Sequence, residues 1–211
     1  MTTRSESSRD AKLTQWAHHL DACAGSSLHE GFATHKPFQN WRARAISPLA
    51  ASPFDNIDDR FWACASGLRT GESRSQRDAS LDELDLDAHG PLSPQASTKT
   101  IEVWTESELA ALQALGWIAH IQERRELFRK ALSTCRWHIE QTQPDNATNR
   151  PWGIHLFVVM SEFEGSDDAR LYAETLLHNC IVTHAIPDAL SADILRDAAE
   201  ALRTIDWQRW L

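Results

Sequence analysis

Two histidines and an aspartate flank a polar connection between two expected helices. His138 falls in the last turn of a helix expected over 123–141, His155 lies near the start of one expected over 150–163, and Asp145 lies in the joint. If these helices pack antiparallel, both imidazoles lie at similar height beneath the joint. Histidines that titrate near neutral pH beside a carboxylate can do general acid–base work. We therefore take these three residues as the catalytic candidates.

The same connection carries residue types that hold ligands. Amides donate and accept hydrogen bonds, a guanidinium beside a helix N-terminus binds an anionic group, and an indole ring offers a stacking face. The binding candidates are Asn146, Asn149, Arg150 and Trp152, with Trp137 as a second stacking face. Together with the catalytic candidates they would surround a shallow pocket at one pole of the molecule.

A purely structural explanation of this connection is also available, and we favour it. Asp145, Asn146, Thr148 and Asn149 are residue types that form turns and helix caps. His155 can equally be a hydrogen-bonded core residue. A tight joint between two helices requires these residue types whether or not a ligand binds there.

Metal and cofactor sites have weaker support. Glu174 and His178 stand four residues apart, a spacing more typical of a helical ion pair than of half a metal site. The four cysteines lie more than 40 residues apart and form no C-x-x-C pair. The chain also lacks H-E-x-x-H, the glycine-rich phosphate loops and G-x-S-x-G. We therefore expect no metal site and no cofactor.

Charge and hydropathy exclude several classes of partner. The net charge is −9, and residues 101–211 carry 10 basic against 17 acidic side chains. Phosphate backbones and anionic membranes are bound through clustered cations, so we expect neither nucleic acid nor a membrane as a partner. There is no apolar run of membrane-spanning length and no secretory signal at residues 1–10, which predicts a cytoplasmic protein. The nine tryptophans are expected to be mainly helix-packing anchors.

Helical spacing of apolar residues predicts an all-α fold. Residues 101–211 are expected to form an antiparallel bundle of about five helices joined by short loops. Thr105 and Glu108 fit a capping box, which predicts that the first helix begins there. The helix over 150–163, with the sequence WGIHLFVVM, is apolar nearly all round and is the expected centre. This succession of hairpins resembles pieces of the α/α toroids found in some sugar-processing and cyclase enzymes, but shares no motif with them.

The rest of the chain is expected to be less regular. Residues 1–69 read as a loosely ordered arm with helices over 10–24 and 55–68. Residues 70–100 are rich in serine and aspartate and contain no aromatic residue, which predicts a polar linker or disordered loop. The predicted organisation is therefore an arm over 1–69, a linker over 70–100 and a bundle domain over 101–211.

Two functions remain open from the sequence. The first is a protein–protein interaction or scaffold protein, which binds another protein or a second copy of itself; the absence of catalytic motifs favours this hypothesis over an enzyme. The alternative is a small enzyme or ligand-binding domain that uses the polar pole at 138–155. The geometry of that pole distinguishes the two hypotheses: an open pocket favours the enzyme or ligand-binding domain, and a packed joint favours the interaction protein.

Overall fold

The computed structural model describes residues 4–25, 57–70, 81, 83–95, 99–142, 148–182 and 186–210. Every regular element among them is a helix, so the all-α fold is confirmed. None of these helices combines the length and the apolar character needed to cross a membrane. The helices are α1 (Arg4–Ala24), α3 (Ile57–Thr70), α5 (Ile101–Ile121), α6 (Arg125–Gln141), α8 (Ile154–Glu164), α9 (Asp167–Val182), α10 (Ala189–Thr204) and α11 (Trp207–Trp210).

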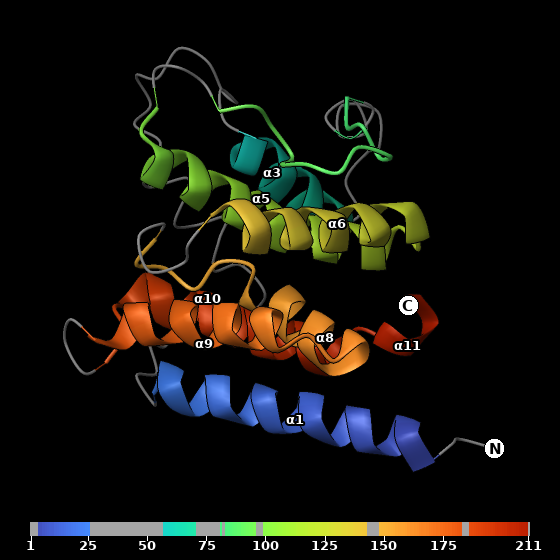
Figure 1. Cartoon of the computed structure of the whole chain (residues 1–211), viewed down its shortest axis with the longest axis vertical. Coiled ribbons are helices and arrows are strands. Elements are labelled where there is room, and N and C mark those ends of the chain that lie inside the picture. Colours follow the sequence, from blue (N-terminus) through green and yellow to red (C-terminus); the bar gives the residue numbers. More distant parts are fainter. Residues whose placement is uncertain are drawn as a thin grey trace.

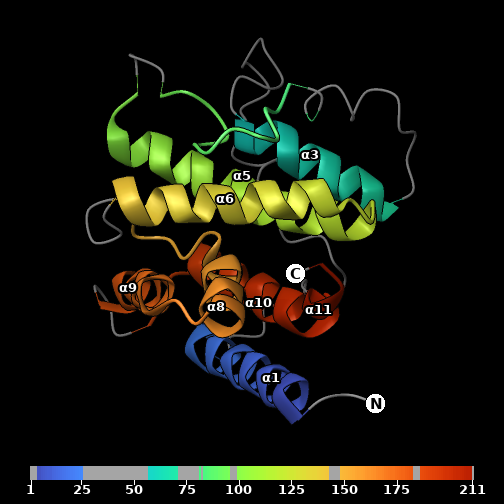
Figure 2. The ribbon, with the colours of Figure 1, turned by 45° about the vertical axis from the view of Figure 1, so that its right-hand side comes forward.

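The helices are stacked in tiers (Figure 1). One tier contains α3, α5 and α6, the next contains α8, α9, α10 and α11, and α1 lies along the outer side of the second tier. Figure 2 shows the same order after a turn of 45°. Thus α1 and α3, consecutive among the described helices, lie on opposite sides of the molecule. Helix α1 packs instead on α10 and α8, and α3 packs on α5.

Helix α8 is the centre of the bundle, as its sequence predicts. All seven residues from Ile154 to Met160 are buried. The helix packs on α9 and α10 in its own tier, on α5 and α6 above, and on α1 below. A helix without a polar stripe must be covered on all sides, and these five neighbours provide that cover.

Helix α8 begins later than the sequence predicts. The expected start was Arg150, with Pro151 in the first turn, but the helix begins at Ile154 after Gly153. Gly153 has φ of +73°, and a Cβ atom there would lie 3.3 Å from the carbonyl oxygen of Leu109. This left-handed residue lets the chain turn sharply against α5 before the helix begins.

The expected capping box is wrong. Helix α5 begins at Ile101 with Thr100 in the N-cap position, so Thr105 and Glu108 are buried inside the helix. The Glu108 carboxylate instead accepts hydrogen bonds from the backbone N–H groups of Leu92 and Ser93, at 2.7 Å each. It therefore caps the backbone of a distant loop rather than its own helix.

That loop belongs to the segment expected to be a polar linker. Residues 83–95, which we call the strap, contain no regular secondary structure, yet Leu92 is buried and Leu84 and Leu86 pack against the core. Polar side chains of α5 and α6 hold the backbone of the strap. Because these side chains lie outside residues 83–95, the composition of the strap itself did not predict that it is anchored. The division of the chain into arm, linker and bundle domain stays a prediction.

The tryptophans in the described residues act mostly as packing anchors. The described residues include eight of the nine tryptophans. Six of these eight side chains are buried: Trp62, Trp104, Trp117, Trp152, Trp207 and Trp210. Trp16 and Trp137 are only partly buried. Trp16 packs against the core at the edge of the buried residues of α1, which are Leu13, Ala17, Leu20 and Ala24.

Because α8 is at the centre of the bundle, truncating one of its buried side chains should strongly lower the free energy of unfolding. Phe157 is fully buried and stacks on Tyr172 of α9 with ring centroids 4.2 Å apart. We expect Phe157→Ala to lower the free energy of unfolding by about 3–5 kcal/mol, measured by urea denaturation, because it leaves a cavity in the core. Leu171→Ala on the exposed face of α9 is the control and should cost less than about 0.5 kcal/mol. Equal effects of the two variants would contradict the central placement of α8.

Candidate functional site

His138 lies in a closed polar cluster at the end of α6. Its ring is fully buried, and Nδ1 lies 3.1 Å from the hydroxyl oxygen of Thr142. Nε2 lies 3.9 Å from a carboxylate oxygen of Glu108 and has no hydrogen-bond partner. Trp104 and Trp137 pack around the ring. Burial lowers the pKa of His138 to about 3, so the ring is neutral at physiological pH.

His155 lies in a different part of the core. It is in the first turn of α8, where its ring packs beside Trp207 of α11, and a Cβ atom added to Gly116 of α5 would meet its Nε2 at 3.0 Å. Neither ring nitrogen has a hydrogen-bond partner, so the expected hydrogen-bonded core histidine is buried but not bonded. Burial lowers the pKa of His155 to about 3 as well.

The two histidines therefore do not line a common pocket. His138 faces Glu108 and Thr142, whereas His155 faces Gly116 and Trp207. Two neutral, enclosed imidazoles are also poor general acids and bases near pH 7. The third catalytic candidate, Asp145, lies outside the described residues, as does Asn146.

The remaining binding candidates at the pole mostly tie helices together. Arg150 forms ion pairs with Glu106 of α5 and with Asp188, the N-cap of α10, each at 3.2 Å. Trp152 is buried against Trp62 of α3 with ring centroids 5.9 Å apart. Asn149 is exposed. The described part of the pole thus resembles a packed joint, and its role as a site stays a prediction.

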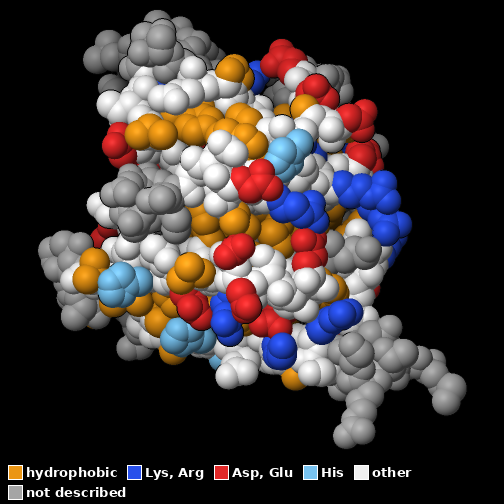
Figure 3. Space-filling view, viewed as in Figure 1, with side chains coloured by type: hydrophobic (Ala, Val, Ile, Leu, Met, Phe, Trp, Pro, Cys, Tyr) orange, Lys and Arg blue, Asp and Glu red, His pale blue; other side chains and the backbone are white. Residues whose placement is uncertain are grey.

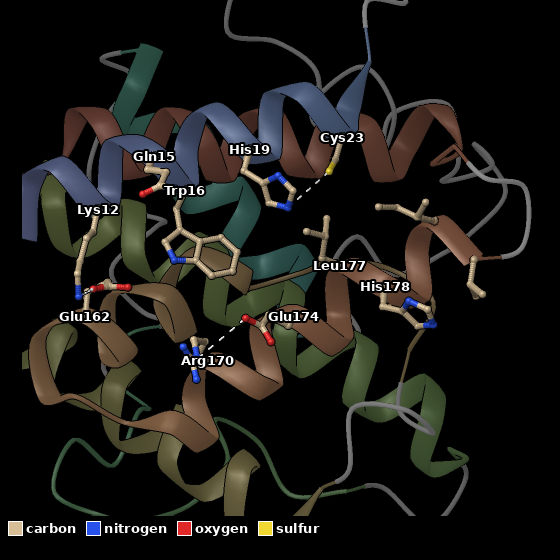
Figure 4. A pocket seen from close by; sticks show the side chains of 12 residues that line it. Lys12, Gln15, Trp16, His19, Cys23, Glu162, Arg170, Glu174, Leu177 and His178 are labelled. Carbon is tan, nitrogen blue, oxygen red and sulfur yellow. Dashed lines mark hydrogen bonds and ion pairs between the residues drawn. The ribbon is translucent and has the colours of Figure 1, made fainter.

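A hollow in the described structure lies elsewhere, between α1 and α9 (Figure 4). It is a groove of about 890 Å³. Seven of its twelve lining residues are exposed, which makes it an open groove rather than an enclosed cavity. The lining residues are Lys12, Gln15, Trp16, His19 and Cys23 of α1, Glu162 of α8, and Arg170, Glu174, Leu177, His178, Ile181 and Val182 of α9.

The two ends of the groove differ in chemistry. At one end the cations are paired: Lys12 with Glu162 at 2.9 Å, and Arg170 with Glu174 at 4.0 Å. Toward the other end the lining combines the apolar Leu177 with the polar His19 and His178, and the Trp16 indole ring is directed into the groove between the two ends. In the space-filling view, charged side chains and apolar patches lie together over this lower part of the molecule (Figure 3).

The histidine and cysteine side chains in the groove do not form a metal site. His19 Nε2 and Cys23 Sγ are 3.9 Å apart on adjacent turns of α1. Partial burial raises the pKa of the Cys23 thiol, which favours the neutral thiol over the metal-binding thiolate. Within the described ranges, no three potential metal ligands come together.

The sequence contained one signal for this groove. Trp16 shares a side of α1 with the core residues Leu13 and Leu20, and its large ring covers the boundary between the buried row and the neighbouring polar row. The pairing with α9 could not be predicted, because it joins residues more than 140 positions apart.

Comparisons with known proteins give no further guidance: no family model, curated protein or solved structure matches this chain.

The buried, unbonded state of His155 predicts that an apolar residue would stabilise the fold. We expect His155→Leu to raise the free energy of unfolding at pH 7.5 by about 1 kcal/mol, because two buried polar atoms without partners are removed. The folded-state pKa of about 3 lies below the ordinary 6.5, so protonation favours the unfolded chain. The advantage of the variant should therefore grow by about 1.4 kcal/mol per pH unit below 6.5.

Urea denaturation at pH 7.5 and pH 5.5 measures both effects. His18→Gln, which replaces an exposed histidine on α1, controls for the loss of a histidine as such. A destabilised His155→Leu protein, or an advantage that does not grow toward pH 5.5, would show that the His155 ring has partners in solution.

Proposed function

We propose that this chain is a protein–protein interaction protein that binds an amphipathic helix of a partner in the groove between α1 and α9. The observation that carries the proposal is the lining of the groove by parallel rows of two helices. Lys12, Gln15, Trp16, His19 and Cys23 follow one face of α1 at spacings of one, three and four. Such rows are the ridges between which a further helix packs.

The size of the groove suits this occupant. The row from Lys12 to Cys23 extends along the helix axis for roughly 17 Å, or about three turns. One turn of a helix of about 10 Å diameter fills roughly 420 Å³, so a groove of about 890 Å³ accommodates about two turns.

The chemistry of the groove favours a helix with a mixed face. Leu177, Ile181 and Val182 offer apolar contact surface along α9. The charges at the other end are paired, so they leave little net charge to attract a charged partner. They favour a partner helix with polar side chains over a strongly charged helix. Helix-in-groove recognition commonly uses apolar anchors at i, i+3, i+4 and i+7 in this way.

A small-molecule ligand fits the same groove less well. Small-ligand sites bury most of the ligand surface, whereas seven of the twelve lining side chains here are exposed. The alternative function at the pole, a small enzyme or ligand-binding domain, gains no support from two separately buried neutral histidines. We therefore place the interaction at the groove.

Site-specific photo-crosslinking in the native cells tests the proposal. A benzophenone amino acid in place of Gln15, which lines the groove, should give a discrete adduct with another polypeptide, and one in place of the exposed Arg129 on α6 should not. Val182→Asp should reduce the Gln15 adduct by about tenfold or more, because docking would bury an unpaired carboxylate.

A matched variant separates this effect from a general effect of added charge. Leu171→Asp places a carboxylate on the same helix at a similarly exposed position that does not line the groove: Leu171 is 62% exposed and Val182 is 61% exposed. This variant should leave the adduct unchanged. No adduct at Gln15, or equal loss in both aspartate variants, would reject the groove as the interaction site.

A further inference from the structure

A serine, a histidine and a glutamate are linked by hydrogen bonds where the strap crosses α6. Ser133 and Glu140 lie seven residues apart on α6, a spacing that places both side chains on one face of the helix. His89 of the strap lies between them. Its Nδ1 is 3.4 Å from the hydroxyl oxygen of Ser133, and its Nε2 is 3.1 Å from a carboxylate oxygen of Glu140.

The order of these contacts determines how the His89 ring can act. A carboxylate only accepts hydrogen bonds, so Nε2 of His89 donates its hydrogen to Glu140. In the neutral ring Nδ1 then has a lone pair, and the Ser133 hydroxyl group donates to it. A hydroxyl group held against the basic nitrogen of an imidazole is a potential nucleophile, because that nitrogen can take its proton.

The same relation of serine, histidine and carboxylate occurs in hydrolases of unrelated folds and in different chain orders. It is recognised by geometry and not by a sequence motif, so the lack of G-x-S-x-G does not argue against it. The two ring nitrogens are exchanged here relative to the usual triad, but each makes the contact that its role requires. The sequence did not indicate this cluster, because His89 is 44 residues from Ser133.

All three side chains are accessible in the described structure. The side chain of His89 is 50% exposed and that of Glu140 is 54% exposed, and Ser133 is partly exposed. A substrate and water can therefore reach the hydroxyl group while the strap stays in place. Because water also weakens electrostatic stabilisation of the transition state, the site suits esters that have a good leaving group.

Two arginines provide positive charge near the serine. Arg129 precedes Ser133 by four residues and Arg136 follows it by three, and both are exposed. These positions neighbour Ser133 on the surface of the helix. Positive charge one turn from the nucleophile favours the negative charge that develops on a carbonyl oxygen during attack.

We propose that Ser133 is a nucleophile that hydrolyses small activated esters, with His89 as its general base. Glu140 is a positioning residue: it keeps the hydrogen of the neutral ring on Nε2 and stabilises the imidazolium that forms during the reaction. This activity does not involve the groove between α1 and α9, so it is independent of the proposed interaction.

The reaction has two steps. In the first, the Ser133 oxygen bonds to the carbonyl carbon of the ester while Nδ1 of His89 takes the hydroxyl proton. The bond between that carbon and the leaving alcohol then breaks, and the alcohol departs with the proton from Nδ1. In the second step water attacks the acyl group on Ser133 with Nδ1 again as the base, which releases the acid and restores the hydroxyl group.

Labelling of the full chain with a fluorophosphonate probe tests the proposal. The probe forms a phosphorus–oxygen bond to an activated serine and releases fluoride, and peptide mass spectrometry identifies the labelled residue. Ser133 should be labelled, and Ser107, a partly exposed serine within α5, should stay at background. Labelling of Ser133 no faster than that of Ser107 would overturn the proposal.

His89→Ala separates catalysis from anchoring of the strap. Loss of a general base should slow the labelling of Ser133 by about a hundredfold. If His89 only anchored the strap, its removal would leave Ser133 equally reactive or more accessible. A rate of labelling that stays the same or rises in this variant would therefore overturn the proposal.

NMR of the imidazole nitrogens tests the role of Glu140. The neutral His89 ring should carry its hydrogen on Nε2 in the unmodified protein and lose this preference in Glu140→Ala, with labelling roughly tenfold slower. Glu126→Ala is the matched control: Glu126 lies seven residues before Ser133, as Glu140 lies seven residues after it, and its side chain is 47% exposed. Hydrogen on Nδ1 in the unmodified protein, or equally slow labelling in both alanine variants, would overturn the proposal.

Discussion

The structure depends on the burial of one helix that has no polar face. Because Ile154 to Met160 are all buried, α8 requires neighbours in every direction, and helices from both tiers and α1 supply them. The cover ends at the last turn of α8, where Glu162 reaches the groove. The groove therefore exists because α1 and α9 both pack on α8 and leave the corner between them open.

Buried polar side chains then fix the positions of the elements around this apolar centre. Gln113 of α5 accepts from Gly153 N at 2.9 Å and donates to Asp197 of α10 at 2.6 Å, so one amide joins three parts of the chain. Trp117 donates to the same aspartate at 3.0 Å. Glu108 has the corresponding role for the strap. These bonds are directional, and so they select one arrangement of helices that apolar packing alone would leave less well defined.

Much of the fold could be predicted from the sequence because its signals are local. Helical spacing located α3, α6 and α8 to within about four residues at the expected ranges 55–68, 123–141 and 150–163, and the apolar run in the last of these identified the central helix. The errors came from groups whose partners are distant. Thr105 and Glu108 satisfy the local pattern of a capping box, but Glu108 binds a loop that precedes its helix. His138 and His155 flank one joint in sequence, yet tertiary packing directs their rings to different neighbours.

The candidate site shows the same limit. The pole at 138–155 attracted attention because its polar residues are close together in sequence, whereas the groove draws its residues from α1, α8 and α9. Trp16, at the edge of the buried row of α1, was the sequence signal for the groove. In physical terms, a joint and a site use the same residue types, and only the three-dimensional surroundings distinguish them.

The proposed occupant of the corner between α1 and α9 is a helix from another protein. The most direct test of this proposal is amide hydrogen exchange of the full chain, alone and with the partner recovered by cross-linking. Exchange in α1 and α9 should become slower on binding, with α5 and α6 unchanged. Slower exchange confined to α5, α6 or the joint before α8, with α1 and α9 unaffected, would contradict it.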